Sequence, residues 1–131
     1  MKLLVCYDGS EQAKKALQIA KEHAGAFDAK IEVASAIDRY LPLEFKDIQS
    51  AKQNLQHEIW QLLGKDDTLF NIHLLIDSCS PGEQLVNFAE RENVDEIIIG
   101  VRRKSKAGKL LFGSTAQYVV LNAPCPVLTV K

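Results

Sequence analysis

The sequence predicts an α/β protein: a doubly wound, five-stranded parallel sheet with helices on both faces. Five short apolar or β-branched segments alternate with four segments whose apolar residues recur at helical spacing. Right-handed crossovers between successive parallel strands place the helices on both sides of the sheet. No internal repeat or linker interrupts the alternation, so the chain is expected to form a single domain over residues 1–131.

The first third of the chain predicts a strand, a helix and a second strand. Residues 2–7 form a short apolar run typical of a buried strand. Ser10 follows as an N-cap, and small apolar residues at helical spacing predict a helix that packs closely on the sheet. Gly25 is expected to end this helix. Residues 30–36 alternate enough between polar and apolar types to predict the second strand.

The middle of the chain predicts a loop over residues 40–43 and then a long helix. An apolar stripe over residues 48–63 marks this helix, which is expected to end at Gly64. Trp60 falls beside the stripe and is expected to cover the edge of the core. Residues 70–76 then have the composition of a third strand.

The next helix carries the strongest start signal in the chain. Ser80 is an N-cap residue, Pro81 occupies the first helical position, and Glu83 completes a capping box. This helix is expected to run to about Glu92. Residues 95–99, rich in isoleucine, then predict a fourth, buried strand.

The segment 100–115, GVRRKSKAGKLLFGST, is the most informative about function. It contains five basic residues and ends where Ser114 and Gln117 show the capping-box pattern of a helix start. The unpaired N–H groups and the positive end of the helix dipole face this loop, so the segment suits a nucleotide phosphate. The helix is expected to end at residues 122–124, before a last strand over 127–130.

In a doubly wound sheet, ligands bind beyond the carboxyl ends of the strands, where the strand order reverses. The strand-end residues are Asp8-Gly9-Ser10, Ala36-Ile37-Asp38, Asp77-Ser78 and Gly100-Val101-Arg102. Neither the glycine pattern of a Walker A loop nor that of a dinucleotide fingerprint is present. A phosphoacceptor receiver domain would need a hydroxyl residue where Gly100 stands.

The whole chain resembles a universal stress protein domain. Residues 3–10, LLVCYDGS, resemble the family's first strand and acidic turn, and residues 122–128, NAPCPVL, resemble its last loop and strand. The family's nucleotide-binding members carry a glycine, two residues, a second glycine, nine residues, then a glycine with serine or threonine. Gly100 and Gly113-Ser114 match the first and last elements, whereas Arg103 replaces the second glycine.

The resemblance implies a Rossmann-like fold that binds an adenine nucleotide, ATP or AMP, and allows Mg²⁺ to accompany ATP. Asp8 would lie near the adenine and ribose, and the backbone around Ala36 would contact the base. Gly100 would let the nucleotide approach the fourth strand. The donors to the phosphate oxygens would be Gly113, Ser114 and Thr115.

Arg103 allows two opposite roles. Its side chain can block the close approach and the positive φ that glycine tolerates, or its guanidinium can bind a phosphate bidentately. A charge-assisted contact is worth about 1.5–3 kcal/mol, which is similar to a backbone strain penalty of about 1–3 kcal/mol. Both roles therefore remain open.

Composition and residue spacing narrow the function classes. The net charge of −1 and the absence of aromatic residues among the basic ones disfavour nucleic-acid binding, and no apolar run approaches the length of a membrane span. Three cysteines and three histidines lack metal-ligand spacing, which predicts no metal site and a cytoplasmic location. No nucleophile–base pair is recognisable, so no catalytic residue is assigned and any ATP hydrolysis is expected to be slow.

Two functions from different classes remain. The first is a stress-response regulator that senses an adenine nucleotide, with the loop 101–112 becoming ordered when ATP or AMP binds. The second is a nucleotide-independent dimeric scaffold, because the family also includes members without the glycine motif. In either case the resemblance implies a homodimer through the last strand, Val127 to Val130, which is expected at the edge of the sheet.

Overall fold

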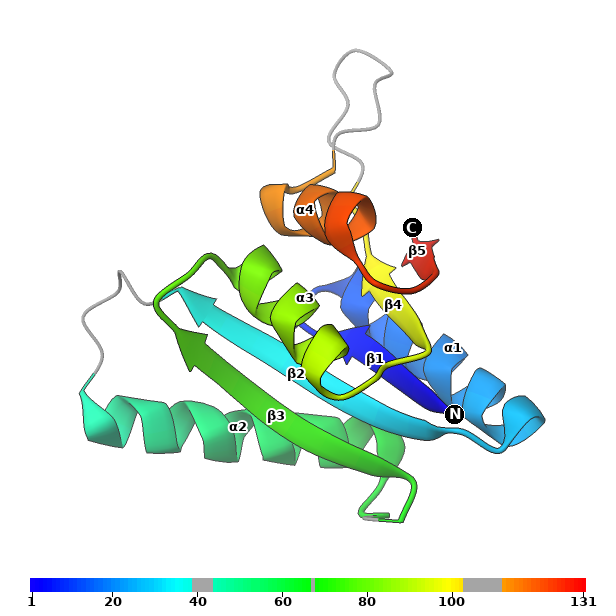
Figure 1. Cartoon of the computed structure of the whole chain (residues 1–131). Helices are drawn as coiled ribbons and strands as arrows, with labels where there is room; N and C mark the ends of the chain where they lie inside the picture. Colours follow the sequence, from blue (N-terminus) through cyan, green and yellow to red (C-terminus); the bar gives the residue numbers. More distant parts are fainter. Residues whose placement is uncertain (39–43, 67, 103–111) are drawn as a thin grey trace.

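A computed structural model of the chain describes residues 1–38, 44–66, 68–102 and 112–131, which form one sheet covered by helices (Figure 1). The expected loop over residues 40–43 and the side chain of Arg103 lie outside these described residues. In chain order the elements are β1 (Lys2–Cys6), α1 (Glu11–Phe27), β2 (Lys30–Asp38), α2 (Phe45–Leu63), β3 (Phe70–Asp77), α3 (Pro81–Arg91), β4 (Glu96–Gly100), α4 (Ser114–Asn122) and β5 (Val127–Val130).

The five strands are parallel and follow the order β3-β2-β1-β4-β5, which confirms the predicted doubly wound sheet. β1 lies at the centre. The chain first moves outward through β2 and β3, and then returns to the other side of β1 to place β4 and β5. The strand order therefore reverses between β1 and β4, the position at which a crevice opens in sheets of this class.

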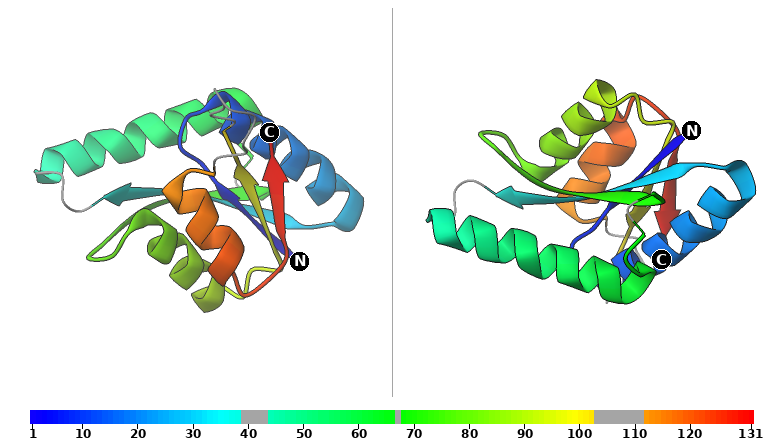
Figure 2. Two further views of the ribbon diagram at one scale, coloured as in Figure 1. Left: turned by 90° about the horizontal axis from the view of Figure 1, so that it is seen from above. Right: turned by 90° about the horizontal axis from the view of Figure 1, so that it is seen from below.

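Helices cover both faces of the sheet, as the views from above and from below in Figure 2 show. Side chains alternate along β1, so Leu3 and Val5 join the core beneath α1 and α2, while Leu4 and Cys6 join the core beneath α3 and α4. A strand buried on both faces needs apolar residues at nearly every position. This requirement explains the continuous apolar runs of β1 and β4.

The start of α1 follows its sequence signal, but its end does not. The Ser10 hydroxyl oxygen accepts a hydrogen bond from the Ala13 N–H at 3.1 Å, as expected of an N-cap. The prediction that Gly25 ends the helix is wrong: α1 continues through Phe27. Asp28 terminates it in the left-handed conformation (φ 51°, ψ 51°), which aspartate adopts more readily than most residues.

The predicted capping box at the start of α4 is also wrong. Ser114 is the first helical residue, and the N-cap is Gly113, with an extended backbone (φ −60°, ψ 158°). The Gln117 N–H donates to the Gly113 carbonyl at 2.9 Å, which closes the first helical turn one residue earlier than predicted. Because glycine has no side chain to accept from the first turn, the N–H groups there are left for another acceptor.

Trp60 covers the edge of the core beneath α1 and α2, as predicted. Its ring carries the Lys65 ammonium nitrogen 4.8 Å from the ring centroid. Trp60 and the first residues of β3, including Phe70, line the same small surface groove. The tryptophan therefore lies near the amino end of β3, away from the carboxyl ends of the strands.

Candidate functional site

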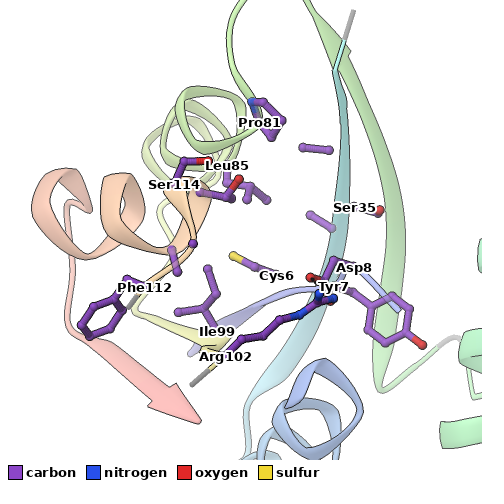
Figure 3. Close-up of a pocket in the computed structure, with 16 residues that line it drawn as sticks. Cys6, Tyr7, Asp8, Ser35, Pro81, Leu85, Ile99, Arg102, Phe112 and Ser114 are labelled. Atoms are coloured by element: carbon purple, nitrogen blue, oxygen red, sulfur yellow. Dashed lines mark ion pairs between the residues drawn. The ribbon is translucent and has the colours of Figure 1, made fainter. Parts of the chain in front are cut away.

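A cavity of about 620 Å³ opens at the carboxyl ends of β1, β2 and β4, where the strand order reverses (Figure 3). The amino ends of α3 and α4 complete its walls. This volume lies within the range of about 300–1,000 Å³ that is usual for small-molecule sites. The cavity is therefore large enough to hold a nucleotide-sized ligand.

The floor of the cavity is apolar. It includes Cys6 from β1, Ile99 from β4 and Leu85 from α3, and all three side chains are buried. Burial raises the pKa of the Cys6 thiol far above its ordinary value, with smaller contributions from Cys125 and Asp8. The thiol therefore stays neutral and acts as a small apolar group. Such a floor is suited to the flat face of an aromatic base.

The β2 wall consists of the small residues Ala34, Ser35 and Ala36, so the strand backbone itself borders the cavity. The position next to Ala36 is fixed by Gln84, a buried residue of α3. Its amide nitrogen donates to the Ile37 carbonyl at 3.0 Å and to the Cys79 carbonyl at 2.9 Å. Gln84 was not among the predicted site residues, although a glutamine within the apolar face of a helix was a usable signal.

The tight turn after β1 brings Asp8 to the mouth of the cavity. Gly9 adopts φ 82°, a conformation that glycine tolerates without steric cost. One carboxylate oxygen of Asp8 accepts from the Ser10 N–H at 2.9 Å. The other lies 3.8 Å from the Arg102 Nη2 at the end of β4. The Asp8 side chain is therefore held by a backbone N–H group of the turn and still exposes carboxylate surface to solvent.

The amino end of α4 supplies hydrogen-bond donors to the opposite wall. Gly113, Ser114 and Thr115 all line the cavity, and the N–H groups of the first turn have no carbonyl partner within the helix. A Cβ added at Gly113 would meet no atom within 4 Å. The helix dipole adds a partial positive charge at this end.

Gly100 lines the cavity, and the structure shows a second reason, besides ligand approach, why this position needs glycine. A Cβ built on Gly100 would lie 2.7 Å from the carbonyl carbon of Gln12 and 2.8 Å from the nitrogen of Ala13. These distances are too short for a carbon atom against a backbone. The glycine therefore allows α1 to cross the end of β4 closely, whatever ligand the cavity holds.

The structure thus brings together six of the seven residues that the sequence analysis selected, all in the lining of one cavity. These residues are Asp8, Ala36, Gly100, Gly113, Ser114 and Thr115. The seventh, Arg103, lies outside the described residues. Its neighbour Arg102, one of the strand-end residues from which the pocket was predicted, also lines the cavity.

Two further polar clusters lie outside the cavity. Glu32, buried in β2, accepts a hydrogen bond from the Asn71 amide at 3.2 Å and lies 2.6 Å from the His73 Nε2. His23 on α1 lies 3.3 Å from Glu96 at the start of β4. Both clusters join neighbouring elements of the fold. Among the described residues, no group of three or more histidine, cysteine or acidic side chains is arranged to hold a metal ion.

A helix that crosses a membrane must be both long and strongly apolar, and no helix among the described residues meets both requirements.

Comparison with known proteins gives the same family at the levels of sequence and structure. The model of the family described as "Universal stress protein family" matches residues 1–131. A universal stress protein of Thermus aquaticus is 34% identical over 140 residues, covering 98% of this chain and 97% of the relative.

Two solved universal stress protein structures from Archaeoglobus fulgidus superimpose on the whole chain. The first has a TM-score of 0.84 at 31% identity and is covered over 98% of its length. The second, in complex with dAMP, has a TM-score of 0.80 at 28% identity and is also covered over 98% of its length.

Proposed function

Because the chain belongs to the universal stress protein family, we propose that it is a stress-response regulator that binds an adenine nucleotide, ATP or AMP, at the carboxyl ends of β1 and β4. The main support is the cavity itself, which combines an apolar floor, a carboxylate and a free helix amino end. These are the groups that a base, a ribose and a phosphate require. The dAMP complex of the Archaeoglobus fulgidus relative supports the ligand class.

In this proposal each part of the nucleotide contacts a different part of the cavity. The base lies over the floor formed by Cys6 and Ile99 and contacts the backbone at Ala36. The ribose hydroxyls donate to Asp8. The phosphate oxygens accept from the first turn of α4, where the donors are Gly113, Ser114 and Thr115.

When ATP is the ligand, Mg²⁺ would be held mainly by phosphate oxygens. Asp8 is the one carboxylate among the described residues that line the cavity, and Mg²⁺ commonly binds one or two carboxylates together with substrate phosphates. No described lining residues form a recognisable nucleophile–base pair. We therefore assign a binding role without a catalytic residue, and we expect ATP hydrolysis to be slow.

The free thiols of Cys6, Cys79 and Cys125 fit a reducing compartment, so the proposed location is the cytoplasm. A second candidate function is a nucleotide-independent dimeric scaffold that assembles through β5. It is supported by the edge position of β5 and by exposed apolar side chains nearby in sequence, Leu121 on α4 and Leu128 on β5.

Nucleotide content and a blocked helix terminus separate these two functions. The first experiment releases ligand from the purified protein by denaturation and identifies it by absorbance and mass spectrometry. The second measures the binding of ATP, ADP and AMP by calorimetry to the parent protein and to Gly113→Glu. The added side chain has room in the fold but projects a negative charge at the phosphate donors, so the variant should fold normally and lose nucleotide binding.

The outcome of the parent measurement decides the function. Binding by the parent that Gly113→Glu abolishes supports the regulator. If the parent shows no binding at millimolar nucleotide, the regulator proposal is wrong and the scaffold function is favoured.

A further inference from the structure

The described lining of the cavity contains one acidic and one basic side chain, and these two are paired with each other. Asp8 follows β1 and Arg102 follows β4, so they lie on the two sides of the strand reversal (Figure 3). The Arg102 Nη2 lies 3.8 Å from the Asp8 Oδ2. The exposed fraction is 58% for the Arg102 side chain and 64% for the Asp8 side chain. The pair therefore lies at the open mouth of the cavity.

Each side chain of the pair now binds its partner, although each could bind a group of the ligand in its place. A carboxylate accepts hydrogen bonds from hydroxyl groups, and here it receives the guanidinium instead. A guanidinium binds phosphate through parallel N–H groups, and here it faces the carboxylate instead. An exposed ion pair of this kind is weak, whereas a charge-assisted contact to phosphate is stronger. A ligand that offers both groups can therefore replace the pair.

Resting on the proposed function, we propose that Arg102 is an anion-binding residue of the cavity and that a nucleotide replaces its contact with Asp8. The ribose hydroxyls take the carboxylate, and a phosphate takes the guanidinium. A nucleoside opens the pair but leaves Arg102 without an anionic partner, and an inorganic phosphate compound leaves Asp8 without a donor. The cavity therefore favours nucleotides over both nucleosides and free polyphosphates.

Calorimetry with ligands that carry one or both groups tests the exchange. Arg102→Ala should weaken ATP binding about tenfold, while adenosine binding stays equal or tightens up to about threefold because Asp8 is released. The preference for ATP over adenosine should therefore fall at least about tenfold. Arg102→Lys keeps the charge but not the fork, and should lose an intermediate amount. The control is Arg91→Ala, an exposed arginine of α3 that does not line the cavity and should leave both affinities unchanged.

The reciprocal variant is Asp8→Asn, probed with pyrophosphate. Removal of the competing carboxylate should strengthen pyrophosphate binding about threefold while weakening adenosine binding. Thermal unfolding of every variant checks that the fold is kept. Equal changes in ATP and adenosine affinity for both Arg102 variants would overturn the assignment of Arg102. An Asp8→Asn variant with unchanged or weaker pyrophosphate binding would overturn the exchange.

Failure of the proposed function has a different signature. If no adenine nucleotide or adenosine binds the parent, the cavity is not a nucleotide site, but pyrophosphate binding that Arg102→Ala removes still supports Arg102 as an anion-binding residue. If pyrophosphate also fails to bind the parent at millimolar concentration, this inference fails as well.

Discussion

Single residues of the cavity serve both the ligand and the fold, and Gly100 shows the difference most clearly. The resemblance assigns this glycine to nucleotide approach, and the structure shows that α1 also needs it. A side chain here would collide with the backbone atoms of Gln12 and Ala13, which cannot move independently of the helix. Its presence in the sequence therefore does not by itself indicate a nucleotide site.

Gly100→Ala is predicted to destabilise the protein by about 1–3 kcal/mol, because the added carbon overpacks the contact between β4 and α1. Urea unfolding followed by circular dichroism measures the change. Gly25→Ala provides the matched control, since Gly25 is exposed inside α1 and a Cβ there meets no atom within 4 Å. That variant should gain about 0.5–1 kcal/mol from helix propensity. A tolerated Gly100→Ala would show that α1 can shift without cost.

The helices place the functional groups, and their starts decide which backbone groups remain available. α1 and α3 begin with serine caps whose side chains accept from the first turn. α4 begins with Gly113, which offers no such acceptor. The position of α4 is fixed by its packing on α3. Gly82 of α3 lies so close to Tyr118 of α4 that a Cβ added at Gly82 would lie 2.8 Å from the Tyr118 Cβ. The uncapped end of α4 is therefore held firmly at the cavity wall.

Serine-to-alanine substitutions distinguish a capping serine from a ligand-binding serine. Ser10→Ala should lower the free energy of unfolding by about 0.5–2 kcal/mol through the lost cap of α1. Ser114→Ala should change it by less than about 0.5 kcal/mol, because the serine lies inside the first turn of α4, and should instead weaken ATP binding. Chemical unfolding and calorimetry on both variants give the comparison. Equal stability losses would show that Ser114 caps the helix after all.

The sequence predicts elements well where burial imposes a pattern and poorly where a few backbone angles decide. β1 and β4 were predictable because strands buried on both faces must be apolar throughout. The carboxyl end of α1 was missed because Asp28, not Gly25, takes the left-handed conformation that ends the helix. The cap of α4 was missed because Gly113, not Ser114, is the N-cap residue. The candidate cavity followed from strand order alone. The role of Arg102 could not be predicted because it depends on the direction of the side chain. The role of Gln84 could not be predicted because it depends on which face of α3 is buried.

At the scale of the whole molecule, the two edges of the sheet differ in length. β3 and β5 form the edges, and β3 has eight residues whereas β5 has four. The Pro126 carbonyl accepts a hydrogen bond from the Ile97 N–H of β4, and the Val130 carbonyl accepts one from the Val101 N–H directly after β4. Backbone groups alternate in direction along a strand, so those of Val127 and Thr129 face away from β4. These outward groups are the ones that a second copy would pair with.

The proposed homodimer through β5 is therefore best tested at Thr129. Thr129→Pro removes an outward N–H and should shift a dimer to monomer while leaving the contact with β4 in place. Leu128→Pro is the contrasting variant, because its N–H faces β4 and its loss should also lower the melting temperature. Sedimentation at micromolar concentration measures the assembly of the parent and both variants. A parent protein that sediments as a clean monomer would remove the main support for the scaffold function.

The position of Trp60 has a practical consequence for these experiments. It is the one tryptophan in the chain and dominates the intrinsic fluorescence. Its ring packs on the core beneath α1 and α2 near the amino end of β3, whereas the cavity opens at the opposite ends of the strands on the α3 and α4 side. Its emission should therefore follow the separation of α2 from the sheet and stay almost silent when a nucleotide enters. A fluorescence titration without signal is thus no measure of affinity.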